Sequence, residues 1–487
     1  AQEHTCKKKN GRTYMNIVEH FLRHDTDRVA YISDDEKITY KMLFETFKNY
    51  YNFLKSKNIH NDDHVMIVLE DSHHFPALAM ACFAVGVKFY VPSPTFTVSN
   101  LQAMIAKTKT KHMFCNTKND KVSKLQKVFI HEVEDIGVAP NFDLGLHTFH
   151  KDETAMYLGT SGSTGVPKLI PHSMENLIEY AKGWSKSLGV EKDDVLYACP
   201  KLCFAHGFSV SLLTNLYVGC QAVIYKDPPT PQKIVKVFNE YSPQYLFMVP
   251  VIANMLVKKQ RTLDLSNLKK AVCASDFLPE IIQDKFKKMY NKQLLNLIGQ
   301  SECLSFYTIA SDNDYAKGSI GRPCENVEIK IVKGDRECDI GEIGELYVKT
   351  KYNANRYLND PEKTADTFKD GWVRTRDRAT IGADGSIYYK GRVDNLIKIK
   401  GLFVAPIEIE NVFLHIKGID DVLIETKIDQ NGIITLHAKV MCDHEIDQLE
   451  LKKRLSAVLD SHKIPKTISR VSEIQRTYNG KKVRQVI

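Results

Sequence analysis

Apolar residues recur along the N-terminal part of the chain in two alternating rhythms. Between residues 40 and 54 they fall every three to four positions, which predicts an amphipathic helix. The apolar run at 64–70, the continuous apolar stretch at 75–85 and the segment at 87–91 predict a strand, a buried helix and a second strand. A helix and a strand follow again within 233–249, and this repetition predicts mainly parallel sheets covered by helices.

The pattern changes after about residue 319, where short strand-like segments are separated by glycine turns. Three of them, 327–334, 344–349 and 385–392, predict a small antiparallel or barrel-like unit. The final segment, 395–487, mixes both rhythms and predicts a compact α+β unit. Within it we expect helices at 407–415 and 447–459, and strands near 421–425 and 433–440.

These patterns predict an α/β protein of two domains. The large N-terminal domain, 1–393, is expected to contain helix-covered, mainly parallel sheets and the small barrel-like unit. A small, mobile α+β domain, 394–487, follows, with the boundary at Asp394. A chain of 487 residues can bury large cores without disulfides or metals.

The charge balance is mildly basic, with 67 Lys and Arg against 59 Asp and Glu and a net charge of +8. An excess of this size, spread along the chain, suits a polyanionic ligand, but it is more often only a solvated surface. No basic run interleaved with aromatic residues marks a nucleic-acid surface.

The eleven cysteines are scattered singly, which favours buried thiols in a reducing compartment over a disulfide framework. Residues 1–12 are polar and basic and lack the apolar core of a signal peptide. The longest apolar run, 75–87, is too short to span a bilayer. We therefore expect a cytoplasmic protein without a membrane partner.

Residues 160–168, Thr-Ser-Gly-Ser-Thr-Gly-Val-Pro-Lys, form the most informative segment, because six of the nine are Gly, Ser or Thr. Glycines allow a tight turn whose N–H groups surround an anion, hydroxyls add neutral donors, and Lys168 adds charge. The spacing is not that of P-loop NTPases, because Pro167 precedes the lysine and Leu169 follows it. Alone, the segment predicts either a phosphate site or a polar loop between a strand and a helix.

Four further motifs follow this loop in order. They are 296–302 (NLIGQSE), 374–377 (RTRD), 391–401 with 406–410 (GRVDNLIKIKG and PIEIE) and 476–484 (RTYNGKKVR). Together the five resemble the signatures of the adenylate-forming superfamily, which includes acyl- and aryl-CoA ligases, peptide-synthetase adenylation domains and firefly luciferase. The resemblance covers essentially the whole chain.

The resemblance implies an enzyme that activates a carboxylic acid with ATP and Mg²⁺ and passes the acyl group to a thiol. A carboxylate is a poor electrophile, and a mixed anhydride with AMP gives it a good leaving group. Because two anions meet in the first step, the site needs cations and fixed dipoles where charge builds up. CoA is the expected thiol cosubstrate, and a carrier-protein phosphopantetheine is the alternative.

Carried over onto this sequence, the resemblance assigns most of an ATP site. Lys168 and the loop before it would hold the β- and γ-phosphates, and Glu302 would reach Mg²⁺, which prefers oxygen ligands. Asp377 would bind the ribose hydroxyls, Arg392 would assist at the ribose or phosphate, and Lys481 would bridge the substrate carboxylate and the α-phosphate. Without the motifs, Lys481 would be only one of several surface lysines. The other expected nucleotide contacts are Thr160, Ser161, Gly162, Ser163, Thr164, Gly165, Ala274, Ser275, Asp276, Asn296, Leu297, Ile298, Gly299 and Ser301.

The resemblance also implies that the C-terminal domain rotates about a hinge at Asp394. Lys481 would leave after adenylation, and the loop containing Lys398, Lys400 and Gly401 would then enter to shape the thiol tunnel. Gly401 would let a pantetheine arm pass close to the backbone.

Four positions depart from the usual motifs. Arg376 stands where Gly of Thr-Gly-Asp is usual, which predicts an altered ribose loop. Gln475 replaces a Pro, Asn395 a second Asp, and Asp276 the Glu of Ala-Gly-Glu-x-Leu-Pro. No motif loses its central charge, so we expect activity.

The acid itself is expected to be aromatic. Segment 201–208 and Ile298 resemble the benzoate- and halobenzoate-CoA ligases, and no Asp stands in 204–207 to meet the ammonium group of an amino acid. His206 is either an aromatic wall of the acyl pocket or a core histidine bonded to backbone. Ser305 offers room or a partner for a ring hydroxyl. The expected acyl pocket is Ala205, His206, Gly299, Ser305 and Phe306.

Three functions remain open on the sequence. The first is an aryl-CoA ligase, and the second is a stand-alone aryl-acid adenylation enzyme that loads a carrier protein. The third is a non-catalytic relative that binds a nucleotide or acyl group, which predicts decay of Lys168, Glu302, Asp377 or Lys481, yet all four types are present. The expected partners are the acid, ATP and CoA, with no nucleic acid, and the chain is expected to be a monomer or homodimer.

Overall fold

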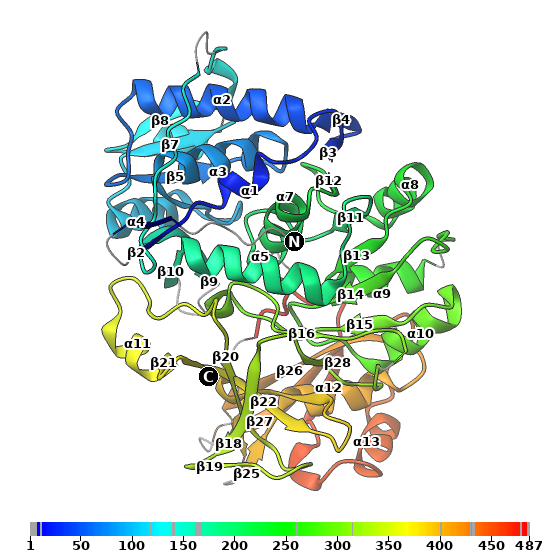
Figure 1. Ribbon diagram of the computed structural model, residues 1–487. Helices are drawn as coiled ribbons and strands as arrows, with labels where there is room; N and C mark the ends of the chain where they lie inside the picture. The colour runs from blue at the N-terminus through cyan, green and yellow to red at the C-terminus, as the bar shows by residue number, and fades with distance from the viewer. Residues whose placement is uncertain are drawn as a thin grey trace.

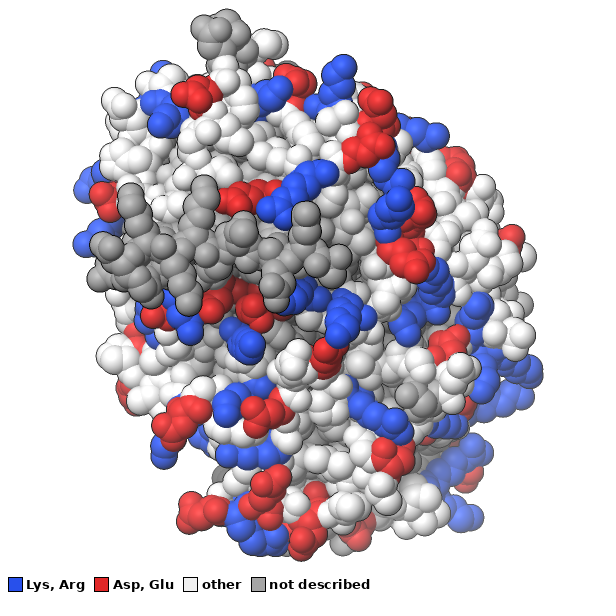
Figure 2. All heavy atoms as spheres, viewed as in Figure 1, with Lys and Arg blue, Asp and Glu red and all other residues white. Residues whose placement is uncertain are grey.

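The computed structural model describes residues 7–9, 12–116, 119–138, 142–160, 168–259, 262–313, 315–399, 402–428, 430, 434–477 and 480–484. Figure 1 shows the N-terminal elements at the top, the central elements in the middle and the C-terminal elements at the bottom. Among the described residues, no helix is both long and apolar enough to cross a bilayer. Positive and negative side chains are interspersed over the face seen in Figure 2, so the net charge is not gathered into one patch there.

The first sheet has six strands and is mainly parallel, as predicted; only β10 and β9 pair antiparallel. Helices α2 (Tyr40–Ser56) and α3 (His74–Val85) pack against each other beside it. The side chain of Thr39 caps α2, and ten of the twelve residues of α3 are buried, which confirms the predicted buried helix. The strand order is β10 (Lys168–Ser173), β9 (Thr154–Thr160), β6 (Lys88–Tyr90), β5 (His64–Val68), β7 (His112–Cys115) and β8 (Phe129–Glu132).

The second sheet has seven strands, parallel except for the β3–β4 pair at one edge. Helices α8 (Pro231–Tyr241), α9 (Pro250–Lys258) and α10 (Glu280–Tyr290) lie along it. The predicted helix and strand within 233–249 are α8 and β13. The strand order is β15 (Leu294–Asn296), β14 (Lys270–Cys273), β13 (Tyr245–Met248), β11 (Val195–Ala198), β12 (Gln221–Ile224), β3 (Val29–Ser33) and β4 (Glu36–Thr39).

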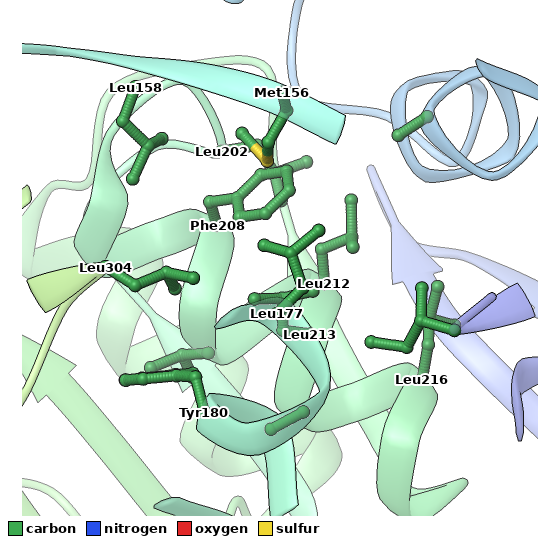
Figure 3. Close-up of a cluster of buried hydrophobic side chains, with 14 of the residues drawn as sticks. Met156, Leu158, Leu177, Tyr180, Leu202, Phe208, Leu212, Leu213, Leu216 and Leu304 are labelled. Atoms are coloured by element: carbon green, nitrogen blue, oxygen red, sulfur yellow. The ribbon is translucent and has the colours of Figure 1, made fainter. Parts of the chain in front are cut away.

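Between these sheets lies one continuous apolar core. Helix α5 (Met174–Leu188) crosses the middle of the molecule and packs on a helical run made of α6 (Ala205–Gly207), η3 (Phe208–Thr214) and α7 (Asn215–Val218). Figure 3 shows side chains of β9, α5 and η3 converging in this core. Segment η3 is a π-helix, a rare form that is frequent at functional sites.

The third sheet is antiparallel, as predicted from its short strands and glycine turns. Helix α11 (Pro361–Thr367) precedes its edge strand β21. Its order is β19 (Arg336–Glu337), β18 (Glu328–Lys333), β20 (Gly344–Lys349), β22 (Trp372–Ile381) and β21 (Phe368–Lys369), with β23 (Ile387–Arg392) also paired to β22.

The C-terminal segment has its own apolar core, whose members run from Ile397 to Ile468. The predicted helices and strands are present, and a salt bridge of 2.8 Å from Lys258 Nζ of α9 to Asp420 connects this segment to the large domain. We call the segment from Ile397 onward the lid. Its elements are β24 (Ile397–Ile399), β25 (Leu402–Val404), α12 (Pro406–Leu414), β26 (Ile419–Ile428), β27 (Ile434–Cys442), α13 (Gln448–Ser456) and β28 (Thr467–Arg470).

The other named elements are β1 (Lys7–Lys9), β2 (Arg12–Tyr14), α1 (Val18–Phe21), α4 (Val98–Thr108), β16 (Thr308–Ile309) and β17 (Arg322–Pro323).

Candidate active site

The carboxyl ends of β14 and β15 bring the expected adenine segments together. These strands are parallel neighbours, and the N–H of Leu297 donates to the carbonyl of Cys273 at 3.0 Å. Residues 274–276 and 297–299 therefore leave the sheet side by side. Ligands of open parallel sheets bind in the crevice outside these strand ends, so this position suits a nucleotide base.

Ser275 has a left-handed backbone, with φ of 78°. It occupies the glycine of the Ala-Gly-Glu motif, so the turn keeps the conformation that glycine favours although the residue has changed. Its hydroxyl lies 3.1 Å from Nδ1 of His206. This contact connects the segment predicted to bind adenine with the segment predicted to line the acyl pocket.

The phosphate loop lies on a hairpin. Thr160 at the end of β9 pairs with Lys168 at the start of β10, and residues 161–167 between them lie outside the described residues, as does the side chain of Thr160. The strand before the loop is present, but the helix that the polar-loop alternative placed directly after it is not. Strand β10 follows instead, and helix α5 begins only at Met174, because 168–173 extends the sheet.

Lys168 and Glu302 meet through a tyrosine. Glu302 lies in the short helix η4 (Ser301–Cys303), and its Oε1 accepts a hydrogen bond of 2.6 Å from the hydroxyl of Tyr357. The Lys168 ammonium lies 5.0 Å from the centroid of the same tyrosine ring. The structure thus places a cation and a carboxylate on one buried aromatic side chain.

Glu302 is suited to bind Mg²⁺ together with substrate phosphates rather than a metal held entirely by protein side chains. Among the described residues no group of three His, Cys, Asp or Glu could hold a metal. Mg²⁺ commonly uses one or two carboxylates together with substrate phosphates, and Glu302 has a second oxygen beside the one bonded to Tyr357.

Asp377 is the most buried charged group of the predicted site, with 5% of its surface exposed in strand β22. Burial raises its pKa to about 6, and the positive charges of Arg392 and Lys481 oppose this rise. Arg392 Nη1 donates to Asp377 Oδ1 at 3.3 Å. Because Glu302 and Asp394 also influence this carboxyl, Asp377 marks the point where the predicted site residues converge.

Arg376, the unusual residue of the ribose motif, also has a left-handed backbone, with φ of 61°. The predicted alteration of the loop geometry is therefore not seen in the backbone; the position keeps the glycine conformation. The Arg376 side chain forms ion pairs with Asp366 and, at 3.2 Å, with Asp394. It connects the ribose loop to the predicted hinge.

The predicted acyl-pocket residues come together from two segments. Gly299 and Phe306 form an isolated antiparallel bridge, and Gln300 N–H donates to the Ser305 carbonyl at 2.9 Å. The ring of His206 meets that of Phe306 edge-on at 4.8 Å. A Cβ on Gly299 would lie 2.2 Å from the Ser305 carbonyl oxygen, so only glycine fits this close approach.

A buried hydroxyl cluster lies behind this pocket. Ser209 Oγ lies 2.9 Å from Ser305 Oγ, and the Tyr180 hydroxyl accepts from the N–H of Phe306 at 3.4 Å. Ser305 therefore has protein partners, and the cluster provides polar atoms within aromatic surroundings that include Trp184, stacked 4.8 Å from Phe306.

His206 is buried, and in the described part of the chain its ring bonds a serine hydroxyl rather than the backbone; its role as a wall of the acyl pocket stays a prediction. Burial lowers its pKa to about 3, so the ring is neutral. Its Nδ1 is bonded to a serine hydroxyl, whereas its Nε2 has no hydrogen-bond partner in the part of the chain that the structure describes.

The lid delivers Lys481 on a tight hairpin. Thr477 N–H donates to the Lys481 carbonyl at 2.8 Å, and Lys481 N–H donates to the Thr477 hydroxyl at 3.1 Å. A Cβ on Gly480, whose φ is 84°, would lie 3.0 Å from Cγ1 of Val251, so the hairpin tip touches the large domain at α9. The Lys481 side chain is exposed, and its charge reaches Asp377.

Ion pairs hold this hairpin to the body of the lid. Lys482 Nζ lies 2.9 Å from Asp421, and Arg484 Nη1 lies 2.5 Å from Glu410, a residue of α12 with 2% of its surface exposed. Burial would raise the pKa of Glu410, but Lys482 and Arg484 hold it below its ordinary value. A crevice between lid and large domain is lined by residues of both, among them Val251, Asn254, Asp276, Glu410, Asp421 and Lys482.

The predicted tunnel residues are only partly described. Lys398 is exposed on β24, 5.9 Å from the ring of Phe403, whereas Lys400 and Gly401 lie outside the described residues. Sequence reasoning missed Tyr357, Tyr180 and Ser209. Their surrounding segments show no unusual composition, so no local signal could have found them.

The chain matches the family model described as AMP-binding enzyme over residues 18–358. Three similar proteins extend the comparison. The 4-hydroxybenzoate–CoA/benzoate–CoA ligase of Rhodopseudomonas palustris is 25% identical, over 94% of this chain and 90% of its own. The p-hydroxybenzoic acid–AMP ligase FadD22 of Mycobacterium tuberculosis is also 25% identical, over 94% of this chain and 66% of its own. The crystal structure of o-succinylbenzoate coenzyme A synthetase from Bacillus subtilis, in complex with ATP and magnesium, superposes with a TM-score of 0.88 at 20% identity, covering 96% and 98% of the two chains.

Proposed function

The chain belongs to the AMP-binding enzyme family, and from this premise we propose that it is an AMP-forming ligase that joins an aromatic acid to CoA. One observation carries the proposal. The hairpin that carries Lys481 contacts the large domain at Val249 and Val251, and the charge of Lys481 acts on Asp377, which Arg392 contacts. A nucleotide with its ribose at Asp377 would then present its α-phosphate between the two domains.

In the first half-reaction the carboxylate of the acid attacks the α-phosphorus of ATP. An oxygen of the carboxylate forms a new bond to the α-phosphorus. The bond from the α-phosphorus to the oxygen of the leaving pyrophosphate breaks, and no proton is transferred. The Lys481 ammonium would stabilise the charge that passes between the carboxylate and the α-phosphate, and Lys168 would hold the outer phosphates. Mg²⁺ bound by Glu302 would neutralise charge on the phosphates.

In the second half-reaction the thiol of CoA attacks the acyl carbonyl. The thioester C–S bond forms, AMP leaves, and the thiol proton passes to solvent or to the leaving phosphate. We propose that the C-terminal domain, 394–487, which contains the lid, rotates about Asp394, withdrawing Lys481 and bringing the Lys398 loop to the site. The separate apolar core of the lid supports motion as a unit.

The aromatic acid follows from the pocket and from the relatives. Phe306, the neutral ring of His206 and Trp184 form a buried aromatic cluster, and such surroundings suit a benzoate-like ring. Two relatives are named for hydroxybenzoates. The buried hydroxyls of Tyr180, Ser209 and Ser305 support a ring substituent that can hydrogen-bond, such as a hydroxyl.

The test is exchange of labelled pyrophosphate into ATP across a panel of aromatic and aliphatic acids. We expect exchange that depends on the acid and is strongest for hydroxylated benzoates. Absence of exchange with every acid would leave a nucleotide- or acyl-binding relative as the better account.

A second candidate is a stand-alone aryl-acid adenylation enzyme that loads a carrier protein, favoured by the relative named as an AMP ligase. Thioester formation measured with free CoA and with a holo carrier protein separates the two. The cytoplasmic location and the monomeric or dimeric state stay predictions.

A further inference from the structure

Tyr357 connects two residues that lie far apart in the sequence. Its hydroxyl donates to Oε1 of Glu302 at 2.6 Å, and Lys168 Nζ lies 5.0 Å from its ring centroid. The side chain is 5% exposed, so water competes little for either contact. A short bond to a carboxylate and an ammonium over an aromatic face are both electrostatically favourable and directional.

The backbone around Tyr357 is fixed to both partners' segments. Ala354 N–H donates to the Glu302 carbonyl at 2.8 Å, and Leu358 N–H donates to the carbonyl of Leu169, the neighbour of Lys168, at 2.8 Å. The N–H of Tyr357 itself donates to the Thr364 hydroxyl of α11 at 2.9 Å. Two hydrogen bonds therefore connect the segment around Tyr357 to η4 and β10, and a third connects Tyr357 to α11.

We propose that Tyr357 is a positioning residue that sets Glu302 and Lys168 at a fixed separation for the phosphates of Mg²⁺-bound ATP. The proposal rests on the function proposed above. By bonding one carboxylate oxygen, the tyrosine holds the side-chain conformation of Glu302 and leaves the second oxygen for the metal. Its ring holds the ammonium of Lys168 on the same side, so that metal and cation meet the phosphates together.

In its contact with Glu302 the hydroxyl of Tyr357 is the donor, and the carboxylate oxygen accepts. A phenylalanine keeps the ring and removes only this donor, and a leucine removes both contacts. The two substitutions therefore separate the two roles.

The experiment measures the dissociation constant of ATP by calorimetry, without acid, in Mg²⁺ and in EDTA. For Tyr357→Phe we expect the gain in affinity due to Mg²⁺ to fall about tenfold, with the value in EDTA unchanged, as for other residues that orient metal ligands. For Tyr357→Leu we expect weaker binding in EDTA as well, because Lys168 loses its support. Phe368→Leu is the matched control: its ring packs 5.2 Å from Tyr357 but touches neither partner, so both constants should stay as in the wild type.

A double variant guards against a merely structural effect. Glu302→Gln should lose the Mg²⁺-dependent gain, and adding Tyr357→Phe to it should change nothing further, because the two act through one contact. An unchanged Mg²⁺ gain in Tyr357→Phe, or the same loss in Phe368→Leu, would overturn the proposal. Failure of the proposed function shows separately, as absence of pyrophosphate exchange in the wild-type protein, because the binding constants need no acid.

Discussion

Asp377 and Lys481 are both assigned to the ATP site, yet the two domains hold them differently. Asp377 is 5% exposed on a central strand, and Arg392 and the neighbouring sheet fix it in place. Lys481 is exposed on a hairpin tip, and ion pairs tie that hairpin to the lid rather than to the large domain.

Among the described residues, the domains contact each other at several points, including Gly391 against Ile407 and Asn254 with the Asp420 carbonyl. Gly480 meets Val249 and Val251, Lys258 pairs with Asp420, and Ile281 of α10 packs on the lid core. A buried, pre-arranged nucleotide site needs no rearrangement during phosphate chemistry, whereas a lysine that must leave afterwards needs a support with its own core. Under the proposed function, the rigid and mobile halves of the reaction therefore reside in different domains.

Removing the charge of Lys481 should give the largest effect on the rate of adenylation. We expect Lys481→Ala to slow adenylation about 10²–10³-fold, because a donor is lost where charge develops in the transition state. Thioester formation from supplied acyl-adenylate should survive, since that step uses the other lid position. Lys427→Ala, an exposed lysine of β26, is the matched control. Equal loss of both half-reactions would contradict the division of labour between the domains.

ATP binding at the buried Asp377 should depend on pH. With the pKa of Asp377 raised to about 6, the carboxyl gains a proton as pH falls through that value and can no longer accept from both ribose hydroxyls. We expect the KM for ATP to rise about tenfold between pH 7 and pH 5. Asp377→Asn should bind ATP weakly at every pH and show no such inflection. A wild-type KM that stays level over this range would remove Asp377 from the ribose site.

The contact between the Lys481 hairpin and the large domain can be changed by adding one methyl group. Gly480→Ala adds a methyl 3.0 Å from Val251 at a backbone φ of 84°, where a side chain costs roughly 1–2 kcal/mol. We expect adenylation to fall about tenfold, with thioester formation from acyl-adenylate little changed. Gly385→Ala tests the general cost of the same strain, because that glycine also has a positive φ but no atom within 4 Å of the added methyl.

The smallest effect is expected at the junction. Arg376→Gly relieves a left-handed arginine but removes its ion pairs with Asp366 and Asp394, two effects of opposite sign on stability. We expect the melting temperature to change by a few degrees at most. Because the ion pair to Asp394 would hold the hinge, the thioester half-reaction should accelerate by about two- to threefold, the scale of an exposed ion pair. A slower thioester step would show that Arg376 assists the rotation instead.

Much of this arrangement was predictable, because its signals are local. The apolar rhythms of 40–54 and 75–85 became α2 and α3, and the apolar run at 64–70 became strand β5. The ordered motifs located Glu302, Asp377 and Lys481, and the charges of Glu302 and Lys481 both act on Asp377. The domain boundary at Asp394 and the roles of the site residues remain predictions.

The backbone conformation of residues that differ from the family motifs was not predictable from the sequence. Arg376 in place of glycine suggested an altered ribose loop, yet its φ is 61°, and Ser275 likewise has a φ of 78°. The surrounding hydrogen bonds and ion pairs fix these turns more strongly than the residue's own preference does. The strand after the phosphate loop was missed for a similar reason, since β10 exists only because β9 offers it an antiparallel partner.

The sequence by itself determined the alternation of helices and strands, the large apolar cores and the order of the chemical motifs, all of which depend on neighbours within a few positions. Only the tertiary structure decided that Tyr357 stands between Glu302 and Lys168, and that Ser209 and Tyr180 face Ser305. These pairs are separated by tens of residues or more, and no periodic pattern encodes them. They arise because sheet pairing and helix packing, which minimise exposed apolar surface and unpaired backbone groups, bring distant segments to the same point.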